Sequence, residues 1–229
     1  MLNAKPWMRE KNEPPVPLKR RSEHQDHWLP WARFNLHRNP FGELSIEERA
    51  RLAVFEDHEL AMGDLRSKEA IQLIGDCGHG KTTRLLAILH RFEGASYAYL
   101  PEDQPCPPIP FGAPAMIDEA QRLPRRARRQ VFATGVPLIL ATHADLARGL
   151  RRFGYRVKTV VIGDQNTPER LARMLNRRID AARLTDAPTI RVSIDLCEQL
   201  LHCFGSNIRA IEHYLYEQVQ HQVMQDGNM

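Results

Sequence analysis

Short apolar runs alternate with segments of helical periodicity through the middle of the chain. Five of these runs have the length and apolar content of strands, and they cover residues 70–74, 96–100, 115–117, 136–141 and 157–162. A glycine-rich turn follows the first run and leads into a helix that begins near Lys81. Strands that are separated by helices predict a parallel α/β sheet.

Local signals predict where this region begins and where its regular structure is interrupted. Residues 45–48 (Ser-Ile-Glu-Glu) form a capping box, in which the Ser45 hydroxyl and the Glu48 carboxylate accept hydrogen bonds from first-turn amides. We expect a helix from there to about Met62. The linker from Pro101 to Pro114 contains six prolines, which excludes a regular helix.

A second helical region follows Gly163. Thr167 and Pro168 are a favourable N-cap and first-turn pair. Apolar residues then recur at helical spacing at Leu171, Met174, Leu175 and Ile179. Two further helices are expected over residues 193–204 and 206–223. We therefore expect a small helical domain, residues 165–229, after an α/β core, residues 45–164.

Residues 1–44 differ from the rest of the chain. They are polar and rich in proline, and they contain all three tryptophans, Trp7, Trp28 and Trp31. Large aromatic side chains in a segment with little other core material indicate an extended arm that docks on another surface. That surface is either the globular body of this protein or a protein partner.

Composition narrows the class of protein. The chain has 229 residues, of which 42% are hydrophobic and 26% charged, as in globular proteins with a real core. Its longest apolar run, Val136 to Ala141, is far shorter than a membrane span, and the N-terminus lacks the apolar stretch of a signal peptide. The four cysteines have no metal-ligand spacing. We expect a cytoplasmic protein without membrane contact.

Charge is distributed unevenly. The formal net charge is +4, but residues 121–183 contain 15 basic and only four acidic side chains. One interpretation is a general preference for arginine on solvated surfaces. The other is a surface that faces phosphates or an acidic partner.

The glycine-rich turn carries the clearest chemical signal. Residues 75–82 match the pattern G-x-x-x-x-G-K-[ST], whose backbone amides surround phosphate oxygens at a helix N-terminus. The pattern predicts that Lys81 binds the β- and γ-phosphates of a nucleotide and that the Thr82 hydroxyl binds Mg²⁺. The expected nucleotide-binding residues are Gly75, Asp76, Cys77, Gly78, His79, Gly80, Lys81, Thr82 and Thr83.

Two later strands end in polar residues. Asp118 follows an apolar strand, where a carboxylate holds the Mg²⁺ ion, and the adjacent Glu119 is placed to activate a water molecule. Activation of water implies hydrolysis, which disfavours a small-molecule kinase. Thr142 ends the next strand, where it either orients the attacking water or the γ-phosphate or simply terminates the strand.

This order of motifs resembles that of AAA+ ATPases. The run from Ile117 to Gln121 is similar to that of a bacterial group which includes TniB-like transposition-helper ATPases and secretion-associated relatives. The resemblance implies a minimal AAA+-like P-loop NTPase sheet with a helical lid, ATP and Mg²⁺ as cofactors, and a homo-oligomer. It departs from the family at residues 101–114, where the family has a helix with pore loops, so threading through a pore is not implied.

The resemblance also implies roles for three further segments. Arg209 corresponds to the lid arginine that reaches the γ-phosphate; alternatively, it pairs with Glu212. Arg152 corresponds to an arginine finger that acts on a neighbouring subunit. Its close rivals are Arg148, Arg151 and Arg156, and a merely basic helix is the other interpretation. Residues 39–42 resemble the segment that lies against adenine.

A cluster of arginines follows Glu119 and suggests a partner. Its members, Arg122, Arg125, Arg126, Arg128 and Arg129, are able to neutralise nucleic acid phosphates, or they form a solvated or subunit-facing surface. Two hypotheses of function follow. The first is an ATP-hydrolysing AAA+ regulator of a DNA transaction whose assembly depends on nucleotide. The second is a nucleotide-switched adaptor that recruits a protein through its N-terminal arm without binding DNA.

Overall fold

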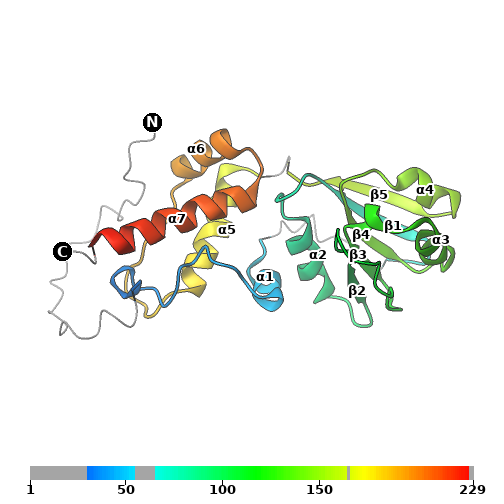
Figure 1. Cartoon of the computed structure of the whole chain (residues 1–229), viewed down its shortest axis with the longest axis horizontal. Coiled ribbons are helices and arrows are strands. Elements are labelled where there is room, and N and C mark those ends of the chain that lie inside the picture. Colours follow the sequence, from blue (N-terminus) through cyan, green and yellow to red (C-terminus); the bar gives the residue numbers. More distant parts are fainter. Residues whose placement is uncertain (1–29, 55–64, 164–165, 227–229) are drawn as a thin grey trace. The chain divides into compact units, whose positions relative to one another are not determined.

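The computed structural model describes residues 30–54, 65–163 and 166–226 (Figure 1). These residues form two compact units. The first, which we call the sheet unit, runs from Leu44 to Asn166. The second, which we call the helical unit, combines the described residues up to Glu43 with those from Thr167 onwards.

The sheet unit contains one five-stranded sheet in the order β2-β3-β4-β1-β5, and every pair of neighbours is parallel. The strands are β1 (Glu69–Ile74), β2 (Ser96–Tyr99), β3 (Ala115–Asp118), β4 (Leu138–Thr142) and β5 (Arg156–Val161). The prediction of a parallel α/β fold is thus confirmed, and a sheet of this order is compatible with a Rossmann-like or P-loop fold.

Helices cover both faces of this sheet. On one face, α2 (Lys81–Leu89) buries Leu85 and Ile88 against strand residues, and α1 (Ile46–Leu52) packs against α2. On the other face, α3 (Arg125–Ala133) and α4 (Ala147–Arg152) bury Phe132 and Leu150 against β3 and β4. Because helices shield both faces, β3 and β4 are buried along their whole length and apolar up to their last residues, Asp118 and Thr142.

The strand order places the functional loops together. β1 lies between β4 and β5, although the chain visits two other strands before it returns to β4. The carboxyl ends of β3, β4 and β1, which are neighbours in the sheet, therefore lie at the same edge. In open α/β sheets this edge is where ligands bind.

Two local predictions at the borders of the sheet unit have different outcomes. The capping box of Ser45 and Glu48 is present, with both reciprocal hydrogen bonds. The helix that it starts ends at Leu52, however, because the backbone at the buried Ala53 is already extended. The prediction of a helix to Met62 is wrong at this point, and residues 55–62 lie outside the described part of the chain.

The proline-rich linker forms no helix or strand between Leu100 and Ala115, as predicted. It returns along the edge strand β2, where the Ser96 hydroxyl donates to the carbonyl of Pro110 and the Ser96 amide donates to that of Pro114. The second bond continues the pairing of β2 with β3, since Pro114 directly precedes β3.

The helical unit contains α5 (Pro168–Ala181), α6 (Ile194–Phe204) and α7 (Ile208–Asp226). Thr167 and Ser193 accept the N-cap hydrogen bonds of α5 and α6. A core of apolar side chains joins the three helices, and it includes Leu36 from the N-terminal segment, which is fully buried.

The described end of the predicted N-terminal arm therefore packs within the helical unit. Its short helix η1 (Ala32–Phe34) and the bridge between Leu36 and Arg183 lie against these helices. The indole of Trp31 donates to the side chain of Gln220 on α7. Trp7 and Trp28 lie outside the described residues.

Arg178 connects this segment to the helices. Its guanidinium group is buried, pairs with Glu212 on α7, and donates to the carbonyls of Pro40 and Gly42. One side chain of α5 thus satisfies the carboxylate of another helix and two carbonyls of the N-terminal segment.

Within the described residues, none of the helices has the combination of length and apolar character that crossing a membrane requires.

We predict that Arg178→Ala lowers the free energy of unfolding by about 3 kcal/mol, because it leaves a half-buried carboxylate and two carbonyls without their donor. Urea unfolding followed by tryptophan fluorescence measures this change, since Trp31 packs in this unit. The exposed neighbour Arg177 provides the control, and its replacement by alanine is expected to cost less than about 1 kcal/mol. Equal losses in the two variants would contradict the assigned role of Arg178.

Candidate functional site

The loop of residues 75–82 connects the carboxyl end of β1 to the N-terminus of α2. Gly80, the N-cap of α2, has a φ of 93°, which a residue with a side chain adopts only under strain. At Gly75 a Cβ atom would lie 2.5 Å from the carbonyl oxygen of Ile162, so only glycine fits there. The two glycines let the chain turn tightly and present first-turn amides of α2, which have no partner within the helix.

Lys81 lies at the centre of the site. The residue is 5% exposed, and its ammonium group donates to the carbonyls of Gly75 and Asp76 at 2.7 and 2.8 Å. Its Nζ atom also lies 3.3 Å from Nε2 of His143. Burial lowers the pKa of Lys81, an effect that the charges of Glu119 and Asp118 oppose.

Asp118 ends β3 and is completely buried. Its carboxylate accepts hydrogen bonds from the hydroxyl of Tyr97 on β2 at 3.3 Å and from the amide of Glu119 at 3.0 Å. The side chain of Thr82 also bonds to it. Burial raises the pKa of Asp118 above its usual range, and these hydrogen bonds offset the increase only partly.

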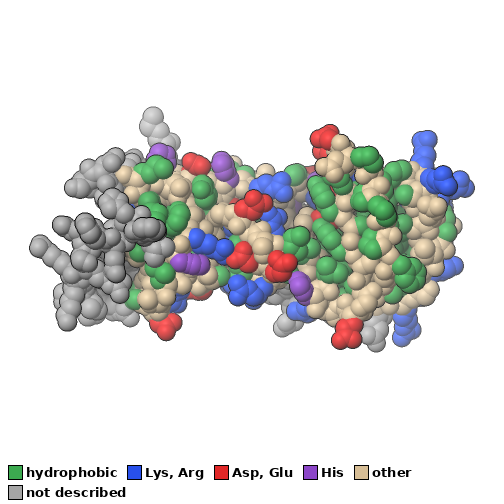
Figure 2. Space-filling model, turned by 60° about the horizontal axis from the view of Figure 1, so that its bottom comes forward, with side chains coloured by type: hydrophobic (Ala, Val, Ile, Leu, Met, Phe, Trp, Pro, Cys, Tyr) green, Lys and Arg blue, Asp and Glu red, His purple; other side chains and the backbone are tan. Residues whose placement is uncertain are grey.

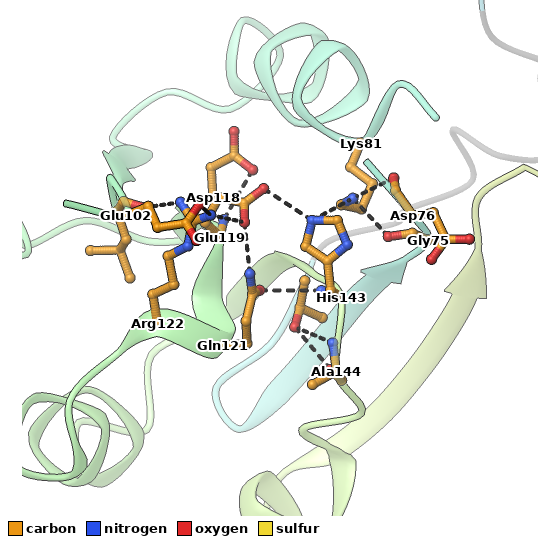
Figure 3. Close-up of polar contacts among 12 residues, drawn as sticks. Gly75, Asp76, Lys81, Glu102, Asp118, Glu119, Gln121, Arg122, His143 and Ala144 are labelled. Carbon is orange, nitrogen blue, oxygen red and sulfur yellow. Dashed lines mark hydrogen bonds and ion pairs between the residues drawn. The ribbon is translucent and has the colours of Figure 1, made fainter. Parts of the chain in front are cut away.

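Glu119 has a left-handed backbone, with a φ of 58°, and precedes the short helix η3 (Ala120–Arg122). Its carboxylate accepts a hydrogen bond from Gln121 at 2.6 Å and lies 3.4 Å from Nε2 of His143 and 3.5 Å from the guanidinium of Arg122 (Figure 3). A non-glycine residue in this conformation is strained, and such strain is concentrated at functional sites. The turn directs Glu119 away from the strand and towards the end of β4.

At the end of β4, the neighbouring residues Thr142 and His143 have different partners. The Thr142 hydroxyl exchanges hydrogen bonds with the backbone of Ala144 at 2.9 and 3.1 Å, which closes a turn. His143 instead lies between Lys81 and Glu119, and its backbone amide donates to Gln121 (Figure 3). The polar group of this strand end that contacts the other site residues is therefore His143.

Sequence reasoning missed three residues of this site: Tyr97, Gln121 and His143. Tyr97 lies on β2, directly beside the strand that carries Asp118. The order of strands, which places β2 next to β3, was the information needed to find it. Gln121 and His143 lie next to predicted site residues, but only the folded loops show that their side chains meet at Glu119.

Other predicted residues of the loop have less direct roles in this arrangement. The His79 ring lies 3.3 Å from the carbonyl oxygen of Ile162, where it holds the loop against the end of β5. Cys77 is exposed, and Gly78 has a φ of 82°. Thr83 is half-buried in the first turn of α2.

The two arginines predicted to act on the nucleotide from a neighbouring subunit and from the helical domain, Arg152 and Arg209, are both exposed. Arg152 is the last residue of α4, and its exposed side chain forms no hydrogen bond or ion pair with another described residue. Its rivals Arg148, Arg151 and Arg156 are exposed as well. Arg209 lies exposed in the first turn of α7, which belongs to the helical unit.

Two further predicted segments have partners of their own. Glu212, considered as a partner of Arg209, pairs with Arg178. In residues 39–42, compared above with an adenine-contacting segment, the Asn39 side chain donates to the carbonyl of Tyr216 on α7. This segment is thereby held within the helical unit.

The donor set fits a Mg²⁺ ion with phosphate ligands. Mg²⁺ prefers oxygen ligands and is commonly bound by one or two protein groups together with phosphates and water. The Thr82 hydroxyl and the Asp118 carboxylate, which bond to each other, provide two such oxygens beside the first-turn amides of α2. The described residues include no cluster of three or more His, Cys, Asp or Glu side chains suited to hold a metal by protein ligands alone.

Comparison of this chain with models of protein families and with curated protein sequences gives no match.

We predict that Asp118→Asn raises the melting temperature by a few degrees near neutral pH in the presence of EDTA. Because the pKa of Asp118 is raised on folding, the folded state binds its proton more tightly than the unfolded chain does. Ionisation of this carboxyl therefore costs stability as the pH rises from the ordinary pKa through the raised one.

Thermal unfolding of wild type and variant over a pH series measures the effect, and the difference between them should disappear at acidic pH. Asp103→Asn, which changes an exposed carboxyl, should give no difference at any pH. A lower melting temperature of Asp118→Asn throughout the series would show that the ionised carboxylate stabilises the fold.

Proposed function

We propose that this protein binds ATP with Mg²⁺ and hydrolyses it. The observation that carries the proposal is the convergence of Lys81, Thr82, Asp118 and Glu119 at neighbouring strand ends of a parallel sheet. A glycine-rich loop, a buried cation, a metal-binding carboxylate and a second carboxylate for water activation are together the parts that hydrolysis of a phosphoanhydride requires.

Lys81 is suited to bind phosphate oxygens. Its ammonium group is held by the loop carbonyls at the N-terminus of α2, close to where phosphates are expected to bind. Its hydrogen bonds to Gly75 and Asp76 can be exchanged for charge-assisted bonds to phosphate, which are stronger. The nearby charges of Glu119 and Asp118 oppose the effect of burial and so favour the charged form that this role requires.

Thr82 and Asp118 are the residues that would hold Mg²⁺. When bound, the ion neutralises charge on the phosphate oxygens and on the leaving group. Tyr97 donates to one oxygen of Asp118 and the Glu119 amide donates to the other. These bonds orient the carboxylate without using all of its lone pairs, since each oxygen can accept more than one hydrogen bond.

Glu119 is the proposed general base. Gln121 donates a hydrogen bond to its carboxylate, and Arg122 and His143 lie 3.5 and 3.4 Å from it, so these three side chains orient the carboxylate at the end of β4. His143 contacts Lys81 as well as Glu119. It therefore links the group that binds phosphate to the group that activates water.

The proposal places this chain with the AAA+ ATPases. The order of the motifs, the parallel sheet and the helical unit that follows it support this assignment. On this assignment the protein assembles into a homo-oligomer in which Arg152 acts on the neighbouring subunit, and Arg209 binds the γ-phosphate from the helical unit. We propose a regulatory role in a DNA transaction, in which nucleotide controls assembly.

We predict that Glu119→Gln binds ATP as wild type does but hydrolyses it about 100-fold more slowly, because an amide cannot accept the proton of the attacking water. Lys81→Ala should lose tight ATP binding in calorimetric titration, since the cation for the phosphates is absent. Glu93→Gln, an exposed carboxylate after α2, serves as the control for both assays. Wild-type turnover in Glu119→Gln would assign this residue a structural role instead.

A mixing experiment tests the role of Arg152. Arg152→Ala and Glu119→Gln should each be inactive alone, because every site lacks one component. In a mixed oligomer, an interface with Glu119 from one subunit and Arg152 from the other is complete, so ATPase activity should return on mixing. Mixed oligomers without activity would show that another arginine is the finger or that one chain completes its own site.

A further inference from the structure

A second charged surface lies on the face of the sheet formed by α3 and α4. The two helices are neighbours on this face. The ring of Phe132 on α3 packs edge-on against that of Phe153, which follows α4, with 5.8 Å between the ring centroids. A Cβ atom placed on Gly149 of α4 would lie 3.7 Å from the Phe132 ring. We call the outer side of these two helices the α3–α4 face.

Exposed arginines cover this face. They are Arg125, Arg126 and Arg129 on α3, and Arg148, Arg151 and Arg152 on α4. Five of them form no hydrogen bond or ion pair with another described residue, and Arg151 interacts electrostatically with the single carboxylate nearby, Asp145. From residue 121 to residue 163 the sequence contains ten Lys and Arg but only this one acidic residue.

Two arginines of the cluster that the sequence suggested, Arg122 and Arg128, do not belong to this exposed surface. The Arg122 guanidinium donates to the carbonyl of Leu100 and pairs with Glu102 at 2.8 Å. Arg128 donates to the carbonyls of Gln121 and Leu123, which end the short helix before α3. Both side chains therefore stabilise local structure, and α4 supplies the other half of the exposed positive charge.

The side chains between these arginines indicate what the face binds. Protein interfaces contain a core of large apolar or aromatic side chains, but all the exposed large hydrophobic residues of the described chain lie outside residues 121–156. The same absence removes the aromatic platforms on which single-stranded bases stack. Arginine, in contrast, binds phosphate groups with paired hydrogen bonds.

We propose that the α3–α4 face binds the phosphate backbone of duplex nucleic acid independently of base sequence. Two adjacent helices present arginines one turn apart, about 5–6 Å between Cβ atoms along each helix. The face thus offers several cations to a rigid polyanion and no apolar group to a protein. Figure 2 shows Lys and Arg side chains projecting from the end of the sheet unit at the right of that view.

This binding does not depend on the proposed hydrolysis of ATP, because the arginines lie outside the cluster around Lys81. The test is therefore made on the full chain without nucleotide, with a duplex of about 30 base pairs over a series of salt concentrations. Fluorescence anisotropy gives the affinity, and its dependence on salt reports the number of phosphates that the protein neutralises, with a log–log slope of about −0.9 for each.

The first variant carries Arg125→Gln, Arg126→Gln and Arg129→Gln. We expect its affinity to fall at least about 10-fold at low salt and its slope to decrease by about 2–3, because three cations that neutralise phosphates are removed. A second variant, with Arg148→Gln and Arg151→Gln, should decrease the slope by about 1–2. Arg152 is retained in both because of its proposed role between subunits.

The matched control removes three exposed cations from elsewhere in the same unit. Arg51 lies on α1, Arg91 follows α2, and Lys158 alternates along β5 with residues that pack towards α3 and α4. Replacing these three by glutamine changes the net charge as much as the first variant does. The control should retain the wild-type slope, and the ATPase rate of the first variant should match that of wild type.

Three results would overturn the proposal. One is an equal loss of duplex affinity in the control and in the first variant, which would show a response to net charge alone. Another is equal affinity for single strands of the same length. The third is competition by polyglutamate of the same charge that matches competition by duplex, which would identify an acidic protein as the partner. An inactive ATPase with intact duplex binding would refute the proposed function and leave this proposal standing.

Discussion

The burial of the Lys81 ammonium group and the Asp118 carboxylate is the constraint that shapes the carboxyl edge of the sheet unit. Removing the ammonium group of Lys81 and the carboxylate of Asp118 from water is costly unless protein groups replace the lost hydration. The carbonyls of the 75–82 loop do this for Lys81, and Tyr97 and Thr82 do it for Asp118. Because these groups come from different strands and from α2, the charges can be accommodated only when the sheet is assembled.

The two carboxylates are adjacent in sequence but lie in different environments. Asp118 is the last residue of a buried strand, and burial raises its pKa. Glu119 begins a left-handed turn that brings its side chain to Arg122 and His143. A strained backbone conformation at one residue therefore directs the two carboxylates to different partners, as the proposed roles in metal binding and proton transfer require.

The sheet also separates two kinds of chemistry. The groups proposed to bind nucleotide gather at the carboxyl ends of the strands and at the start of α2, whereas the α3–α4 face presents its arginines on the outer side of the unit. Arg122 lies between the two, since it contacts Glu119 and is followed within three residues by α3. The same stretch of chain thus belongs to both surfaces.

The sequence by itself determined the features that depend on near neighbours. The alternation of apolar runs and helical periods was enough to predict the parallel α/β sheet. The capping box at Ser45 and the N-cap residue Thr167 mark the starts of α1 and α5. Most residues of the candidate site were predictable for the same reason, because a phosphate-binding loop is a continuous stretch of chain. Gly80 is required by the local backbone path, because its φ is positive.

Only the tertiary structure decided which side chains meet. It turned the Thr142 hydroxyl onto the backbone of Ala144 and placed His143 between Lys81 and Glu119. The side chains of Arg122 and Arg128 donate to nearby carbonyls in the folded chain. The packing of Phe132 against Phe153 places the arginines of α3 and of α4 on one face. These outcomes depend on strand order and helix packing, which bring distant segments together. The free energy of a contact depends on all the groups that share its space, and neighbours in sequence are only some of them.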